Sequence, residues 1–265
     1  MINDQQLAEE EAPYYRIQSV DRTLTILQCF VREKRPLGVS ELARMMSLNR
    51  SAVHRFLLTL KDHGYVTQVR DSDRYSIGPA AFELGAVFTN STDLTAEGRK
   101  VLIELVRQTG CLAHLGILDQ GTVLYLLNVE PDRGQYLFGA VGQRRMVYNT
   151  ALGKSLTAWL PEDRVDDILD KCSFEQITKH TIGTPEQYKR ELEQIRQEGI
   201  AFDREESSIG AFCISAPVRD KWDDVIAAIS ISAYGLSEEK IREMGLVVKS
   251  SAAQLSRRLG HMSGL

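Results

Sequence analysis

The amino-acid sequence predicts an α+β protein in which a linker helix joins an N-terminal winged helix-turn-helix domain to a larger domain with an antiparallel sheet. Helical periodicity in three short segments before residue 62 is followed by the alternation of a β-hairpin. From Cys111 onward, β-rich runs occur in pairs with helical segments beside them. The expected divisions are an acidic arm (1–13), the winged helix-turn-helix domain (14–78), the linker helix (79–91) and the second domain (92–265).

The composition is that of an ordinary globular protein, with 43% hydrophobic and 26% charged residues in a chain of 265. No run of 18 apolar residues predicts a membrane span, and the N-terminus lacks the basic and apolar parts of a secretory signal. The four cysteines form no CxxC pair: Cys29, Cys111, Cys172 and Cys213. Reduced thiols, a cytoplasmic location and no membrane partner are therefore expected.

The charge is divided unevenly along the chain. Residues 1–13 carry four acidic side chains and no basic one, whereas residues 14–78 carry 11 Lys and Arg against 6 Asp and Glu. The net charge of the whole chain is −4, so the remainder is acidic. A small basic module ahead of an acidic one suits contact with a phosphate backbone, although charge alone does not prove it.

Three helices are predicted before the hairpin. The first lies around Val20–Phe30, with apolar residues at helical spacing that include Leu24 and Leu27. The second is "VSELARMM", for which Ser40 is the expected N-cap, and the third is "RSAVHRFLLTL" after an expected Asn49 cap.

The third helix predicts a DNA-reading surface. Its core stripe is Val53, Phe56, Leu57 and Leu60. A turn of about 100° per residue places a polar and basic set on the outward side, consisting of Arg50, Ser51, His54, Arg55 and Thr59. Such a face can meet base edges and phosphates in the major groove of double-stranded operator DNA.

The hairpin supplies the wing. Residues 65–77 alternate about a "DSD" turn, and Arg70 and Arg74 flank its tip. We expect these two arginines, together with Arg22, to contact phosphates or the minor groove. The alternative is a small helical domain with a charged surface.

Residues 79–91 are predicted to form a helix whose apolar residues are not confined to one face. Apolar positions cover most of its surface, so burial on several sides is expected. Two explanations stay open, packing against a second subunit or a core helix of the second domain.

The second domain is predicted to hold strands at 111–119, 122–130, 134–141, 200–203, 211–218 and 225–233. Helices are expected from Thr150, from Pro161, from a Thr184 cap ending at Gly199, and from a Ser237 cap near the C-terminus.

Two of these strands carry small polar residues on one face. Side chains alternate along a strand, so Cys213 and Ser215 share a face, as do Ser230 and Ser232. If the two strands pair as a hairpin, the four side chains can line a small-molecule pocket. The alternative is that they pack under a helix with each hydroxyl bonded to backbone.

Two further elements favour a pocket. Thr150 is a plausible N-cap, so Ala151 and Leu152 would offer backbone N–H groups to an anion. Asp203 begins an acidic cluster, and its carboxylate can accept a hydrogen bond from a hydroxyl or an amide N–H group. The competing interpretations are a solvated Lys154 and a solvated acidic loop.

The segments "SVDRTLTILQCF", "VSELARMMSLNRSAVHRFLLTLKDHGYV", "TALGKSLTAWLP", "GIAFDREESSIGAFCISAPVRD" and "AAISISA" together resemble the IclR family of bacterial transcription regulators. The resemblance runs from about Ile17 to the C-terminal helix. It implies a dimerising linker helix, a GAF-like effector-binding domain, assembly as a homodimer or tetramer, and control by a small organic metabolite.

Carried over by motif, effector positions fall on Ala151, Leu152, Asp203, Cys213, Ser230 and Ser232, and the residue pattern adds Ser215. The predicted function is a DNA-binding regulator, by family habit a repressor, whose effector is a carboxylic acid or related amide. An activator, or an enzyme built on the sensor domain, is the alternative.

The sequence offers no catalytic or cofactor motif. GxSxG, Walker and GxGxxG patterns are missing, and Cys213 has no histidine nearby in the sequence. Cys111 and His114 have CxxH spacing, but positions i and i+3 of a strand face opposite sides, which disfavours a shared metal. We expect no catalytic residue, no cofactor and no metal.

Overall fold

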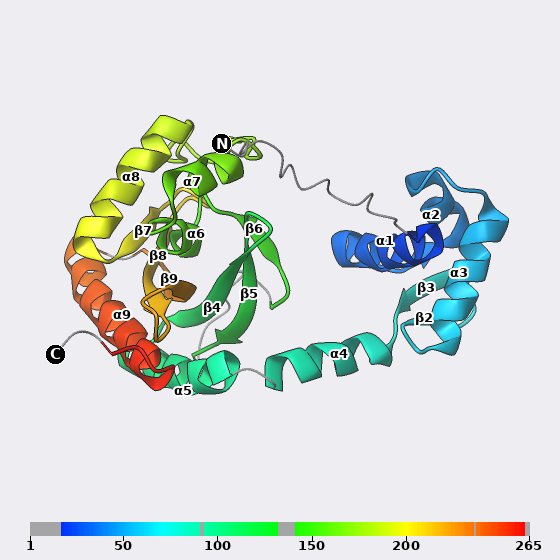
Figure 1. The fold of residues 1–265 in the computed structure, drawn as a ribbon, viewed down its shortest axis with the longest axis horizontal. Helices are drawn as coiled ribbons and strands as arrows, with labels where there is room; N and C mark the ends of the chain where they lie inside the picture. Colours follow the sequence, from blue (N-terminus) through cyan, green and yellow to red (C-terminus); the bar gives the residue numbers. More distant parts are fainter. Residues whose placement is uncertain (1–16, 91–92, 132–140, 236, 263–265) are drawn as a thin grey trace, which may run out of the picture. The chain divides into compact units, whose positions relative to one another are not determined.

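A computed structural model of the chain describes residues 17–90, 93–131, 141–235 and 237–262 (Figure 1). It divides into two compact units, Met1–Phe88 and Thr89–Leu265, and each is described by itself. The acidic arm predicted for 1–13 lies outside the described residues.

The first unit is a winged helix-turn-helix. Its elements are α1 (Gln18–Glu33), β1 (Leu37–Gly38), α2 (Val39–Met45), α3 (Arg50–Asp62), β2 (Val66–Gln68) and β3 (Arg74–Ile77). The three strands are antiparallel in the order β1-β3-β2. A core that includes Ile26, Phe30, Leu42, Leu57 and Val66 holds the helices against this small sheet. The predicted hairpin and three-helix order are confirmed.

Local details of the three helices differ from the expectation in two places. The Asn49 side chain accepts a hydrogen bond from Ala52 N at 2.7 Å, so the predicted cap of α3 is confirmed. The predicted cap at Ser40 is wrong, because α2 already begins at Val39 and its N-cap is Gly38. In α1, Val20 and Leu24 are exposed, because Ile26, Cys29 and Phe30 form the buried side instead.

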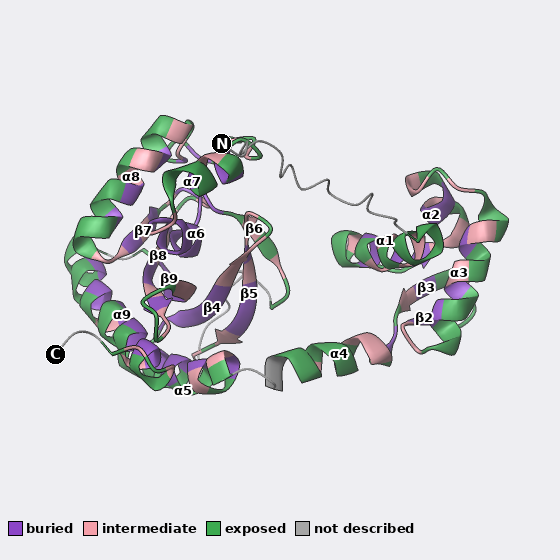
Figure 2. Ribbon diagram, viewed as in Figure 1, coloured by how far each residue is buried: buried purple, intermediate pink, exposed green. Residues whose placement is uncertain are grey.

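The linker helix α4 (Pro79–Asn90) is tied to the wing at its start. Gly78 N donates to Tyr65 O, and a Cβ at Gly78 would lie 2.2 Å from Gly64 O, so this close approach requires glycine. Beyond that point the apolar side chains of α4 are exposed, with Phe82 at 79% and Val87 at 67% (Figure 2). Burial on several sides within one chain is therefore wrong, and so is the alternative of a core helix.

The second unit is built on a six-stranded antiparallel sheet in the order β6-β5-β4-β9-β8-β7. Its strands are β4 (Leu112–Asp119), β5 (Thr122–Val129), β6 (Arg144–Met146), β7 (Ala201–Arg204), β8 (Ala211–Arg219) and β9 (Val225–Tyr234). Its helices are α5 (Asp93–Thr109), α6 (Ala151–Thr157), α7 (Glu162–Leu169), α8 (Pro185–Glu198) and α9 (Glu238–Arg258). The predicted caps Thr150, Thr184 and Ser237 are confirmed by their hydrogen bonds.

Helices cover both faces of this sheet (Figure 1). Helices α5 and α9 pack on one face over a core that includes Leu115, Ile214 and Ile231. Helix α6 packs on the other face against β7, β8 and β9, with α8 behind it. A Cβ at Gly153 would lie 2.4 Å from the Val147 backbone, so glycine lets α6 lie close to the segment that leads into it.

One predicted strand cannot be assessed, and one observed strand was not predicted. The expected strand at 134–141 lies outside the described residues apart from Val141, which is exposed. The short strand β6 instead pairs with β5 at the edge of the sheet, through Arg145 opposite Val123.

Candidate functional site

The outward face of α3 is polar and exposed, as its periodicity predicts. Val53, Leu57 and Leu60 are buried on the opposite side. The exposed set comprises all five of the predicted DNA-contacting residues of the helix: Arg50, Ser51, His54, Arg55 and Thr59. Asn49 caps the helix by accepting from Ala52 N, and the N-terminus of such a helix favours an approaching phosphate.

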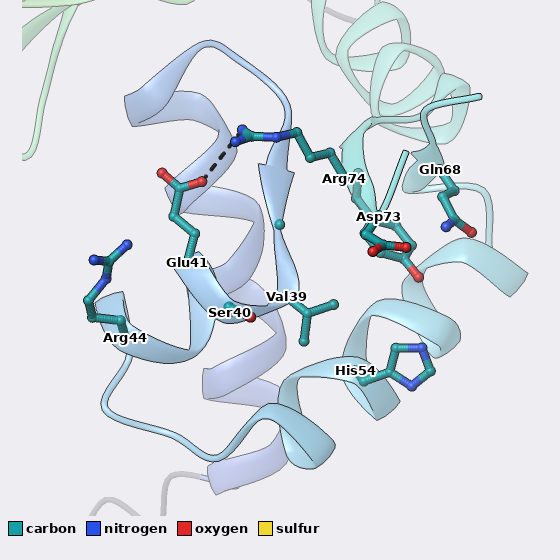
Figure 3. A pocket seen from close by; sticks show the side chains of 10 residues that line it. Val39, Ser40, Glu41, Arg44, His54, Gln68, Asp73 and Arg74 are labelled. Atoms are coloured by element: carbon teal, nitrogen blue, oxygen red, sulfur yellow. Dashed lines mark ion pairs between the residues drawn. The ribbon is translucent and has the colours of Figure 1, made fainter. Parts of the chain in front are cut away.

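A wide depression lies beside this face, between α2, α3 and the wing (Figure 3). Its lining includes Ser40, Arg44, His54, Gln68 and Arg74. Arg44 and Gln68 were not singled out from the sequence, because neither stands in the outward stripe of α3. The depression joins α3 and the wing into one concave polar surface.

The wing arginines lie in different surroundings. Arg70 is exposed in the turn between β2 and β3. Arg74 lies in β3, where it donates to Pro36 O at 3.0 Å and lies 3.7 Å from a Glu41 carboxylate oxygen (Figure 3). Arg35 also pairs with Glu41, so Arg74 belongs to a cluster that ties the wing to β1 and α2. Arg22 is half-buried on α1, away from the depression.

The strand register brings the predicted polar residues of the second unit together. Cys213 lies opposite Ser232, and Ser215 opposite Ser230, so β8 and β9 pair as the hairpin that was expected. On the outer sides of this pair, Asp203 of β7 lies opposite Cys213, and His114 of β4 opposite Ser230. All of these residues share the sheet face that α6 covers.

A small cavity of about 20 Å³, enough for one water molecule, opens on this face. Nine residues line it: Tyr125, Arg145, Thr150, Ala151, Asp203, Ser207, Cys213, Ser230 and Ser232. Five of the seven predicted effector positions are among them. The other two, Leu152 and Ser215, are buried but do not line the cavity. Leu152 packs in the apolar core beside Gly116. The Ser215 hydroxyl is buried without a hydrogen-bond partner among the described residues.

Arg145 is the lining residue that sequence reasoning missed. It is half-buried, and no hydrogen bond or ion pair joins its guanidinium to any residue that the structure describes. Its charge nevertheless reaches the cavity wall, where it helps to lower the pKa values of His114, Tyr125 and Cys213, against the larger effect of burial for the latter two. The strand β6 that carries Arg145 is three residues long, too short for a periodic signal.

Asp203 is turned toward its own loop. Its Oδ1 accepts from Glu206 N at 2.7 Å and from Ser207 N at 3.3 Å, and its Oδ2 accepts from Ser207 Oγ at 2.6 Å. Burial raises the pKa of the Asp203 carboxyl, while these hydrogen bonds oppose the rise. The loop that follows β7 is thereby folded against the cavity wall.

Behind this loop lies a buried ion cluster. Lys154 has no exposed surface, and its Nζ donates to Glu206 Oε1 (2.6 Å), Glu191 Oε1 (3.2 Å) and Phe202 O (2.8 Å). The interpretation of Lys154 as solvated is therefore wrong. The solvated acidic loop is wrong for Asp203 and Glu206, which are both buried. Burial raises the pKa of the Glu206 carboxyl, and the Lys154 ammonium opposes that rise.

The CxxH pair separates to the two sides of the sheet. Cys111 Sγ donates to Thr109 O and lies in the core beneath α5 and α9, whereas His114 faces Ser232. Within the described residues, no group of three metal-ligating side chains is found. Nor does any helix of the described chain have the length and apolarity needed to cross a membrane.

The fold, a winged helix-turn-helix followed by an α+β domain on an antiparallel sheet, is that of a helix-turn-helix transcription regulator. Residues 19–70 match the IclR helix-turn-helix domain, and residues 86–257 match the bacterial transcriptional regulator IclR C-terminal domain. The chain belongs to the IclR family, so the resemblance seen in the sequence is confirmed.

Individual relatives agree along nearly the whole chain. The HTH-type transcriptional regulator KdgR of Escherichia coli is 35% identical over 92% of this chain and 94% of the relative. The HTH-type transcriptional regulator XynR of the same organism is 32% identical over 92% of this chain and 98% of the relative. The crystal structure of Thermotoga maritima IclR matches with a TM-score of 0.73 at 30% identity, covering 93% of this chain and all of that one. KdgR and XynR are both named as transcriptional regulators.

Replacing Lys154 by Met tests the ion cluster. The substitution leaves Glu206 buried without its cation, and we expect a loss of about 3–5 kcal/mol in the free energy of unfolding at pH 8. A carboxyl whose folded-state pKa is raised destabilises the fold above its unfolded pKa, so part of the loss should return as the pH falls toward 5 and Glu206 takes up a proton. Chemical denaturation at both pH values measures this.

The double variant Lys154→Met/Glu206→Gln is the control. Without the Glu206 carboxylate, the recovery at acidic pH should shrink. A Lys154→Met protein as stable as the wild type at pH 8 would contradict the role given to this cluster.

Proposed function

We propose that this protein is a repressor that binds operator DNA through α3 and the wing, and that a small organic anion in the cavity changes its occupancy of the operator. The observation that carries the effector part is Arg145, a cation on the cavity wall with no partner among the described residues. A buried or half-buried charge is normally paired, so an anionic ligand is its natural complement.

The DNA-binding part is supported by the exposed α3 face and the depression beside it. Arg50 and Arg55 are the side chains best suited to guanine edges or phosphates, and Arg70 lies where a wing meets the backbone. We further propose repression because two relatives are named as repressors, the transcriptional repressor IclR of E. coli and the acetate operon repressor of Salmonella typhimurium.

The chemistry of the cavity favours an acid with further polar groups. Arg145 suits a carboxylate, and Ser230 and Ser232 suit hydroxyl or carbonyl oxygens. A structural neighbour at 19% identity and TM-score 0.79 is an IclR homologue complexed with 4-hydroxybenzoate, although that likeness extends only to the fold. Because the cavity has about the volume of one water, an organic acid must bind an arrangement with a larger cavity. Such differential binding is what regulation requires.

We propose that two copies associate through α4 and α1. Four apolar side chains of α4 are exposed: Phe82, Leu84, Val87 and Phe88. The N-cap residue Ile17 and three residues of α1, Val20, Leu24 and Val31, are exposed at spacings of three, four and seven residues, which gives an apolar strip suited to another helix. Apolar surface of this extent on two helices is unusual on a monomer. A regulator that meets the chromosome also acts in the cytoplasm.

Arg55→Ala tests the reading helix. Loss of a bidentate contact to a base should weaken binding by about 1–3 kcal/mol, or roughly 5- to 150-fold in Kd. Fluorescence anisotropy with a duplex selected by the wild-type protein from a random library measures this. Arg164→Ala, which removes an exposed arginine of α7, is the charge-matched control. Equal operator affinity in Arg55→Ala and wild type would reject the assignment.

Arg145→Gln tests the anion site. In a thermal-shift panel of carboxylic acids and their amides, the wild type should be stabilised by acids above amides, and this preference should disappear in the variant. Arg144→Gln is the neighbouring control, since Arg144 pairs with Asp119 and does not line the cavity. If carboxylic acids still stabilise Arg145→Gln but no longer stabilise Ser230→Val, the acid binds in the cavity without Arg145, and the role given to Arg145 is wrong.

Val87→Glu tests self-association. A carboxylate in the centre of an apolar interface should shift the protein to a smaller species in sedimentation velocity, because burial of an unpaired charge costs several kcal/mol. The control is Glu83→Gln on the same helix. A variant that sediments like the wild type would show that α4 does not hold the subunits together.

A further inference from the structure

A chain of hydrogen bonds runs through the sheet to the cavity wall, and two of its members, Asn128 and His114, have no part in the function proposed so far. Asn128 Oδ1 lies 2.9 Å from His114 Nδ1, and His114 Nε2 lies 3.2 Å from Ser232 Oγ. Ser232 Oγ in turn lies 3.1 Å from Cys213 Sγ. The chain thus starts on β5, crosses β4 and ends on two cavity-lining residues of β9 and β8.

The imidazole of His114 is held in one protonation state and one orientation. Burial, with a smaller contribution from the Arg145 charge, lowers the pKa of His114 to about 4, so the ring is neutral near pH 7. The Tyr125 ring meets it edge to face with centroids 5.3 Å apart, which fixes the plane of the imidazole. A neutral imidazole has one N–H donor and one acceptor.

The partners decide which nitrogen carries the proton. An amide oxygen only accepts, so the contact with Asn128 Oδ1 places the proton on His114 Nδ1. Nε2 is then an acceptor, and the Ser232 hydroxyl donates its only proton to it. Burial, the Asp203 charge and a hydrogen bond to Asp203 raise the pKa of the Cys213 thiol, so Cys213 stays protonated and its one proton can go to the Asp203 carboxylate or to Ser232 Oγ. With its proton donated to His114 Nε2, Ser232 Oγ keeps at least one lone pair for the cavity.

We propose that Asn128 and His114 are specificity-determining positioning residues, which make Ser232 a hydrogen-bond acceptor and so select an effector with an O–H or N–H group at that end. The inference rests on the proposed function and deepens it. With Arg145 at the anion end, the effector class becomes the hydroxy acids, in preference to oxo acids of the same size. A ketone oxygen would meet the lone pair of Ser232, and a hydroxyl would donate to it.

The tautomer is tested without any ligand. Full-length protein with ¹⁵N-labelled histidine is examined by NMR at pH 7, and the signals of His114 are identified among the five histidines by their loss in His114→Phe. We expect a protonated Nδ1 and an unprotonated Nε2. A protonated Nε2, or an imidazolium, would overturn the proposal, because Ser232 would then be free to donate its proton to the cavity.

The selectivity is tested with two pairs of acids that differ only in a hydroxyl or an oxo group, lactate with pyruvate and 3-hydroxybutyrate with acetoacetate. Calorimetric titration of the wild type should give at least roughly tenfold tighter binding of the hydroxy acid in one pair, since a mismatched buried polar group is costly. His114→Phe and Ser232→Ala should each reduce this ratio toward one. The control His63→Phe replaces an exposed histidine of the first unit and should keep the ratio.

The outcomes separate the two proposals. If acids bind through Arg145 without a preference for the hydroxy acid, the role proposed for Asn128 and His114 is wrong and the anion site still stands. The same holds if the preference is unchanged in both His114→Phe and Ser232→Ala. Wild-type protein that binds neither pair would reject small hydroxy acids as the class. If no carboxylic acid of the wider panel binds either, the proposed effector site falls as well.

Discussion

The antiparallel register of β8 and β9 is the constraint on which the second unit depends. Because successive side chains alternate between faces, one register places Cys213, Ser215, Ser230 and Ser232 together under α6 and places Ile214 and Ile231 in the core beneath α5 and α9. A slip by one residue would exchange the two sets and bury the hydroxyls among apolar side chains. The same choice that satisfies the hydrophobic core therefore builds the polar wall of the cavity.

The polar groups on that face are held by partners that lie further from the cavity. Asp203 is fixed by the loop after β7, and that loop is anchored through Glu206 on the buried ammonium of Lys154. Ser232 is fixed from the other side by His114 and Asn128. Under the proposed function, a ligand that enlarges the cavity would have to work against both supports.

Much of this could be predicted from the sequence because it rests on local patterns. The outward face of α3, the caps at Asn49 and Thr150, and the serine face of β9 all follow from periodicity and short-range chemistry. The partners brought in from elsewhere could not be predicted. Arg145 lies on an edge strand of three residues, and Lys154 pairs with Glu206, which is 52 positions further along the chain. The apolar residues of α4 indicated burial, but Phe82, Leu84 and Val87 are exposed.

Under the proposed function, occupancy of the cavity and occupancy of the operator are coupled. Linkage requires the coupling to be reciprocal. The direct measurement is calorimetric titration of the most stabilising acid into the protein, once alone and once saturated with its selected operator duplex. We expect the acid's Kd to change by the same factor by which the acid changes operator affinity, about 5- to 150-fold. Equal Kd values in the two titrations would contradict the account.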